Sequence, residues 1–159
     1  MTEVGAKIAT PDIVSGGQTG ADRAALDWAI DHQVPHGGWC PAGRLAEDGR
    51  IPENYQLRET PTSSYPERTR RNVEDSDATL IVSPQSPEGG TLLTLRHAKE
   101  INKPVLVVTL ENEKEAPVLL RAFVRKHKIS ALNVAGPRIS GSNEVEGMVR
   151  RLLDETFGN

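Results

Sequence analysis

The chain has 159 residues, of which 36% are hydrophobic and 26% charged, and 19 Lys and Arg against 22 Asp and Glu give a formal net charge of −3. This predicts one domain over residues 1–159, and the short apolar runs exclude a membrane partner, because a spanning helix needs roughly 20 such residues. The acidic balance and the 4% aromatic content argue against a nucleic-acid partner, while a single cysteine and an N-terminus without an apolar leader predict a cytoplasmic protein.

The first part of the chain begins with a predicted strand at residues 12–15, followed by the turn GGQTG and a helix at 21–32. A second, poorer strand is predicted near residues 36–40. The pattern then stops until about residue 64, in a stretch with several prolines and glycines. Structureless loops of this length are uncommon in compact domains and are usually functional or disordered.

Regular spacing resumes with a helix at residues 65–75, for which Ser63 or Ser64 supplies the N-cap. Strands follow at 78–83 and 105–110, a helix at 91–102 lies between them, and a helix at 116–126, a weak strand at 132–135 and a helix at 143–157 complete the chain. Short apolar strands that alternate with amphipathic helices predict an α/β domain with a mainly parallel five-stranded sheet and helices on both faces.

Two glycine-rich turns each follow a strand and open a helix. In a parallel sheet both turns lie at the carboxyl edge, where glycine allows close backbone approach and the free amides of a helix start attract an anion such as phosphate. Glycine also serves such turns for geometry alone, but the repeated Gly-Gly pair with a nearby threonine favours binding. The predicted ligand-binding residues of the two turns are Gly16, Gly17, Gln18, Thr19, Gly20, Asp22, Gly89, Gly90 and Thr91.

The middle of the chain supplies further candidates. Arg68, Thr69 and Asn72 share one face of the helix at 65–75 and offer an anion clamp beside an amide. A solvated charged helix is the alternative interpretation of this face. The long loop adds Arg44, which we expect to close over the ligand together with Trp39, whose indole suits stacking on a flat ring.

Several standard signatures are missing from the sequence. Neither glycine turn has the G-x-G-x-x-G spacing and no GxxxxGK[ST] occurs, which disfavours NAD dehydrogenases and P-loop ATPases. The four histidines form neither HxxxH nor HxH, so no metal site and no zinc is predicted. Cys40 is interpreted as a small buried hydrophobe rather than as a soft ligand to a molybdenum centre.

Over residues 13–110 the chain resembles the molybdenum carrier family, described as circularly permuted YpsA-like members of the SLOG nucleotide-binding superfamily. The resemblance is carried by IVSGGQTGADRAALDWA, GGWCPAGRLAEDGRIPENYQLRET, YPERTRRNVEDSDATLI and GGTLLT. It implies a three-layer Rossmann-like fold that binds a phosphorylated small molecule, either a nucleotide or the molybdenum cofactor, and it favours a homo-oligomer. Phosphoribohydrolases of the same superfamily carry PGGxGTxxE, and this chain has Thr94 in place of the glutamate.

Three functional hypotheses follow. The leading one is a cytoplasmic carrier that binds a phosphate-bearing nucleotide or a molybdopterin-type ligand at the carboxyl edge of the sheet. The alternative is an enzyme, a nucleotide hydrolase that uses a carboxylate such as Glu47, Asp75 or Asp77, although nothing in the sequence positions one of them. The third is a nucleotide-sensing regulatory module.

Overall fold

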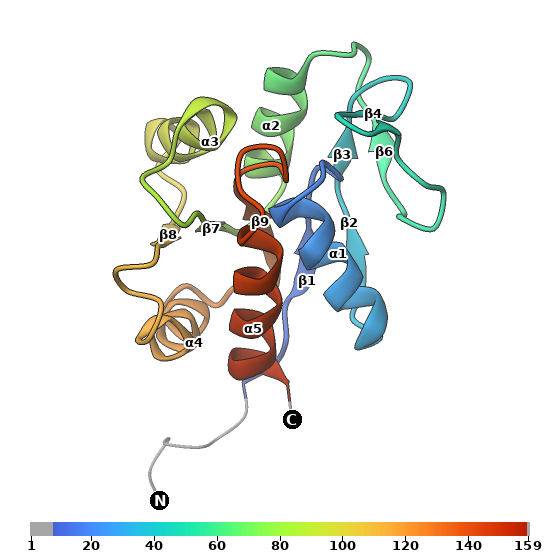
Figure 1. Ribbon diagram of the computed structural model, residues 1–159. Helices are drawn as coiled ribbons and strands as arrows, with labels where there is room; N and C mark the ends of the chain where they lie inside the picture. Colours follow the sequence, from blue (N-terminus) through green and yellow to red (C-terminus); the bar gives the residue numbers. More distant parts are fainter. Residues whose placement is uncertain (1–7, 159) are drawn as a thin grey trace, which may run out of the picture.

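A central sheet of five parallel strands organises the computed structural model, which describes residues 8–158 (Figure 1). The sheet order is β2-β1-β9-β7-β8, and every neighbouring pair is parallel. These strands are β1 (Asp12–Val14), β2 (His36–Gly37), β7 (Ala78–Val82), β8 (Val105–Val108) and β9 (Ala131–Ala135). The predicted α/β fold with a five-stranded parallel sheet is confirmed.

Helices cover both faces of the sheet and complete three layers. One layer holds α1, α4 and α5, in which α5 packs against both α1 and α4, and the other holds α2 and α3 (Figure 1). The helices are α1 (Ala21–Asp31), α2 (Tyr65–Glu74), α3 (Gly89–Glu100), α4 (Ala116–His127) and α5 (Val145–Phe157). No helix of the described residues is both long and apolar enough to span a bilayer.

The strand order is that of a Rossmann-like sheet whose chain starts at a different point. When β9 is counted as the first strand, the order β2-β1-β9-β7-β8 becomes 3-2-1-4-5, the beginning of the doubly wound order. The amino end of β1 and the carboxyl end of α5 lie at the same end of the molecule (Figure 1). The strand order also places β9, which the sequence predicted as a weak strand, at the centre of the sheet. Its Leu132 and Val134 side chains are fully buried.

The main core lies between the sheet and the layer of α1, α4 and α5. Leu80, Leu132 and Met148 are among its fully or almost fully buried side chains, and Trp28 of α1 is 1% exposed. The Trp28 indole N–H donates to Asp154 over 2.8 Å, so this large ring is buried without leaving its polar atom unpaired. The N-cap prediction for α2 is also confirmed, because the Ser64 hydroxyl accepts a hydrogen bond from the Glu67 amide.

The strand predicted near residues 36–40 is confirmed at His36–Gly37, but it is shorter than predicted, because the chain turns away from the sheet at Gly38. The φ of Gly38 is +137°, and a Cβ there would overlap the Ser15 carbonyl oxygen. Only glycine allows this close approach. The strand is consequently split into β2, in the main sheet, and β3 (Trp39–Cys40), which pairs with β6 (Arg58–Glu59) in a separate small sheet.

Residues 38–62, here called the inserted segment, are not a structureless loop. Besides the β3–β6 pair they form an antiparallel hairpin of β4 (Leu45–Ala46) and β5 (Gly49–Arg50). Their apolar side chains build a second hydrophobic cluster around Leu26 of α1, which comprises Leu26, Cys40, Ala46, Ile51 and Tyr55. Strands of two residues are too short to produce a periodic pattern, which is why the sequence did not predict them.

Candidate ligand-binding site

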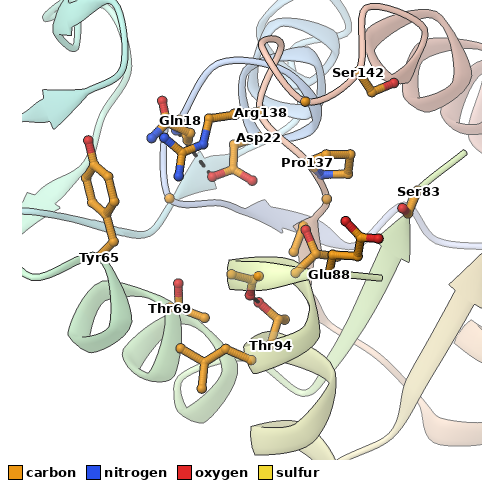
Figure 2. Close-up of a pocket in the computed structure, with 18 of the residues that line it drawn as sticks. Gln18, Asp22, Tyr65, Thr69, Ser83, Glu88, Thr94, Pro137, Arg138 and Ser142 are labelled. Carbon is orange, nitrogen blue, oxygen red and sulfur yellow. Dashed lines mark hydrogen bonds between the residues drawn. The ribbon is translucent and has the colours of Figure 1, made fainter. Parts of the chain in front are cut away.

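A cavity of about 840 Å³ opens at the carboxyl ends of β1, β7 and β9 (Figure 2). Its walls come from the turn after β1, the turn after β7, the loop after β9 and the first turns of α2. The two glycine-rich turns that the sequence singled out thus line one cavity. This is the position at which the winding of a doubly wound sheet changes direction and where such folds bind ligands.

Three helices begin at this cavity: α1, α3 and α5. Their N-cap residues are Gly20, Glu88 and Glu144, and none of the three accepts an amide hydrogen bond on its side chain within the described residues. In contrast, α2 has a side-chain cap at Ser64. The first amide of α1 donates to the Pro137 carbonyl oxygen, so this helix start is closed by the backbone. Free first-turn amides carry the positive end of the helix dipole, so the starts of α3 and α5 at one cavity favour an anion.

The second glycine turn is open toward the cavity. A Cβ placed on Gly89 or on Gly90 would meet no heavy atom within 4 Å. Gly89 has a φ of +52°, whereas the backbone of Gly90 is ordinary helix. Glycine at position 90 is therefore required neither by packing nor by backbone strain, and it leaves the start of α3 accessible.

The first glycine turn is mostly occupied by the protein itself. Gly16 lines the cavity, but a Cβ on Gly17 would press on Leu57, and a Cβ on Gly20 would overlap the Pro137 carbonyl oxygen. The Thr19 hydroxyl donates to Glu47 and lies behind the cavity wall. Of the predicted residues in this turn, Gly16, Gln18 and Asp22 reach the cavity, while Gly17, Thr19 and Gly20 build the turn.

Asp22 is a buried carboxyl group on the cavity wall. Burial raises its pKa from 3.8 to about 6, although the nearby Arg68 guanidinium and the Gln18 amide act in the opposite direction. The distance from the Arg68 Nη1 to the Asp22 Oδ2 is 3.7 Å, and the Gln18 amide donates to Oδ2 over 3.2 Å. Burial therefore moves the pKa of this carboxyl from the acid range to about 6.

The α2 face contains all three residues predicted for it. Arg68 lines the cavity and is held in place, because its Nη1 donates to the Gly16 carbonyl oxygen over 3.0 Å. Thr69 also lines the cavity. Asn72 reaches the cavity, but its amide is paired with the backbone N–H and C=O of Trp39, at 2.8 and 2.9 Å. Asn72 therefore fixes the inserted segment to α2.

Arg44 and Trp39 are not among the residues that line the cavity. The Arg44 side chain is buried and donates to the carbonyl oxygens of Ile51, Pro52, Tyr55 and Leu57. Trp39 lies against the guanidinium groups of Arg58 and Arg71, 4.2 and 4.8 Å from its ring. Arg44 thus holds the inserted segment together and Trp39 packs between this segment and α2, which corrects the expectation that they close over a ligand.

Cys40 is fully buried in the second hydrophobic cluster, and burial raises the pKa of its thiol. Of the acidic candidates, Asp75 accepts from the Trp39 indole and Asp77 accepts from the Ser130 and Ala131 amides, and neither lines the cavity. Within residues 8–158, no group of three or more His, Cys, Asp or Glu side chains is arranged to hold a metal ion.

The sequence interpretation missed the loop between β9 and α5. Residues 136–138 and 141–144 line the cavity and supply its third turn. A Cβ on Gly136 would overlap the Val82 carbonyl oxygen, so glycine allows β9 and β7 to end side by side. The available signal was the same as for the other turns, namely a strand that leads into a glycine-containing segment before a helix.

Arg138 is the exposed cation of this third turn. Its guanidinium carbon lies 5.8 Å from the centre of the Tyr65 ring. Among the described residues, no carboxylate forms an ion pair with it within 4.0 Å. An arginine at the mouth of a cavity whose guanidinium N–H groups form no ion pair with a carboxylate is suited to an anionic ligand.

Glu47 of the inserted segment holds the third turn in place. Its carboxylate accepts hydrogen bonds from the Thr19 hydroxyl and from the amide and hydroxyl of Ser140. These hydrogen bonds lower the pKa of Glu47. The Ile139 amide also donates to the Thr19 hydroxyl, so the first turn, the third turn and the inserted segment are joined at one point beside the cavity.

Comparison with known proteins places these features in context. A family model described as the circularly permutated YpsA SLOG family matches residues 13–157. The crystal structure named "Putative molybdenum carrier protein", from Syntrophus aciditrophicus SB, shares 49% sequence identity and superposes with a TM-score of 0.92. The match covers 94% of this chain and 96% of that one. No match was found among curated proteins.

Proposed function

The chain belongs to the circularly permutated YpsA SLOG family, and we propose that it is a cytoplasmic carrier of a phosphate-bearing nucleotide or molybdopterin-type cofactor. The ligand's phosphate would lie at the starts of α3 and α5, within reach of Arg138. The observation that carries this proposal is that α3 and α5 both begin, without side-chain caps, at one cavity of about 840 Å³. A cavity of this size suits a ligand of nucleotide dimensions.

The residues present fit both of the ligand classes considered. A nucleotide and a molybdopterin each combine a phosphate with a planar ring system, and the cavity combines helix starts and an exposed arginine with the Tyr65 ring. The name of the Syntrophus protein supports a molybdenum cofactor as the cargo. The pterin would supply the metal's attachment, and this chain's residues would hold the phosphate and the ring.

A carrier is proposed in preference to a hydrolase because of the residues in the second turn. Thr94 stands where the related phosphoribohydrolases have their glutamate, and its hydroxyl donates to the Gly90 carbonyl oxygen over 3.0 Å. Asp75 and Asp77 are engaged away from the cavity. Incubation with a panel of nucleoside monophosphates separates the two functions, because released base or phosphate requires catalysis.

The proposal is tested by native mass spectrometry of freshly purified protein, with metal analysis of the same sample. We expect a bound species of a few hundred daltons that contains phosphorus. Co-purified molybdenum would support the cofactor as cargo, and a nucleotide mass without metal would support the nucleotide. If no species co-purifies and isothermal titration with AMP, GMP and inorganic phosphate shows no heat of binding, the proposal is wrong.

A further inference from the structure

Tyr65 is the aromatic residue of the cavity wall. It is the first residue of α2, and the other side chains that line the cavity in the described part of the chain are not aromatic. Its ring is half-buried and faces the turn after β1 across the opening (Figure 2). Aromatic rings at the rim of a ligand cavity commonly hold flat ligands by stacking.

Two arginines lie near this ring but differ in their freedom to move. Arg68 has its guanidinium carbon 5.3 Å from the ring centre, and it is buried and bonded to the Gly16 carbonyl oxygen. Arg138 is 5.8 Å from the ring centre, exposed, and without an ion pair within 4.0 Å among the described residues. Arg68 is therefore held in the wall by a hydrogen bond, whereas the exposed Arg138 side chain has no such bond within the described residues.

The distance between the Arg138 guanidinium and the Tyr65 ring determines what fits between them. Stacked planar groups lie about 3.5 Å apart, so a ring held between Tyr65 and Arg138 needs about 7 Å between them. The present 5.8 Å is smaller than this, and Arg138 has to move outward by roughly 1 Å. A planar guanidinium suits the outer side of such a stack, because it attracts the π-face of the ring.

The wall next to Tyr65 has the polarity that a flat heterocycle needs. Pro66 and Thr69 of α2 and Leu93 and Thr94 of α3 line the same cavity as Tyr65 and combine apolar groups with hydroxyls. The helix starts of α3 and α5 line the same cavity. A ligand that carries both a ring and a phosphate can therefore contact Tyr65 and a helix start at the same time.

We propose that Tyr65 and Arg138 form a stacking site for a planar heteroaromatic ring, so that the cavity selects phosphate esters that carry such a ring over simple sugar phosphates. The inference rests on the proposed function and adds to it the residues that recognise the ring. Trp39, which the sequence offered as a candidate for stacking, lies outside the cavity.

The test compares AMP and GMP with ribose 5-phosphate in isothermal titrations of the full chain. Stacking of one base contributes about 1–3 kcal/mol, which corresponds to roughly 5- to 150-fold in affinity. We expect AMP or GMP to bind at least 10-fold more tightly than ribose 5-phosphate. Tyr65→Leu is expected to remove most of this preference and to leave the affinity for ribose 5-phosphate unchanged.

Two conservative variants serve as matched controls. Tyr65→Phe retains the ring and should retain the preference, while Arg138→Lys retains the charge but loses the planar group and should lower only the affinity for AMP and GMP. Equal affinity for nucleotides and ribose 5-phosphate in the wild type, or a preference that survives Tyr65→Leu, would overturn the stacking site alone. Absence of binding for all three compounds would overturn the proposed function together with this inference.

Discussion

The inserted segment and the cavity rim contain similar residues, yet they use them in opposite ways. Arg44, in the inserted segment, is 5% exposed and donates to four backbone carbonyls, whereas Arg138, at the rim, is exposed and has no carboxylate partner within 4.0 Å among the described residues. The comparison teaches that a charged residue indicates a ligand site only if its hydrogen-bonding groups are not already paired with other groups of the protein.

The same contrast holds for glycine and for carboxylates. Gly17 is packed against the inserted segment, while Gly90 faces open space. Asp48 and Asp27 join the inserted segment to α1, through Arg23 and the Tyr55 hydroxyl, whereas Asp22 faces the cavity. The inserted segment therefore supports the site, and the residues of the rim are left free for a ligand.

The largest effect is expected from removing the Arg44 guanidinium. Arg44→Met leaves carbonyl oxygens of the inserted segment without their donors, and we expect it to destabilise the protein by about 3–5 kcal/mol. Urea unfolding followed by circular dichroism measures this loss. Arg50→Met, at a neighbouring exposed arginine, is the control and should cost less than about 1 kcal/mol. Similar losses in both variants would break the comparison.

Asp22 gives the next largest effect, through the pH dependence of stability. Its pKa is raised to about 6 in the folded protein, so the folded state binds more protons than the unfolded state between about pH 4 and 6. The stabilisation is complete below about pH 4 and is lost as the pH rises through 6, by about 3 kcal/mol in total. Asp22→Asn cannot titrate and should lack this loss.

The measurement for Asp22 is urea unfolding of the wild type and Asp22→Asn at pH 4 and at pH 7.5. The difference between the free energies of unfolding of the two proteins at each pH excludes the contributions of the other titrating groups, because both proteins share them. We expect the variant to gain about 3 kcal/mol relative to the wild type between the two pH values. An unchanged difference would mean that the carboxyl is solvated like those on the outer surface.

Gly90 sharpens the comparison between the two glycine turns. Gly90→Leu puts a bulky side chain at the open start of α3 and should lower AMP affinity by at least 10-fold, or about 1.4 kcal/mol. Gly90→Ala is the matched control, and it should stabilise the helix by about 0.5–1 kcal/mol with little change in affinity. Titration calorimetry and thermal unfolding measure both quantities. Unchanged affinity in the leucine variant would place the ligand elsewhere.

The smallest effect is expected at Arg138, where a substitution should lower ligand affinity without lowering stability, in contrast to Arg44. Arg138→Gln is expected to weaken ribose 5-phosphate binding about 5-fold, because it removes a charge that attracts the phosphate, and to weaken AMP binding somewhat more, because it also removes the planar group that stacks on the ring. Its stability should change by less than about 0.5 kcal/mol, since the side chain is exposed. Binding at two salt concentrations checks the electrostatic origin, since the wild type should lose more affinity in salt than the variant. A destabilised variant with normal affinity would reverse the assignment.

Much of the fold was predictable because its signals are local. The strands at β1, β7 and β8 and the five helices follow from apolar periodicity, and their predicted bounds differ from the observed ones by a few residues at most. The first turn of α2 was predictable from Ser64 and Glu67. The inserted segment was not, because two-residue strands carry no period and its stability comes from contacts with α1.

The sequence by itself determined the α/β alternation and marked two glycine turns as candidates, since periodicity and turn chemistry depend only on neighbouring residues. The tertiary structure alone decided that β9 lies at the centre, which brings the loop of Arg138 beside the other two turns. It also decided that the Arg44 guanidinium donates its hydrogen bonds to backbone carbonyls of the inserted segment. Hydrogen bonds between residues far apart in the chain depend on how the helices and strands pack together, and local sequence patterns do not determine that packing.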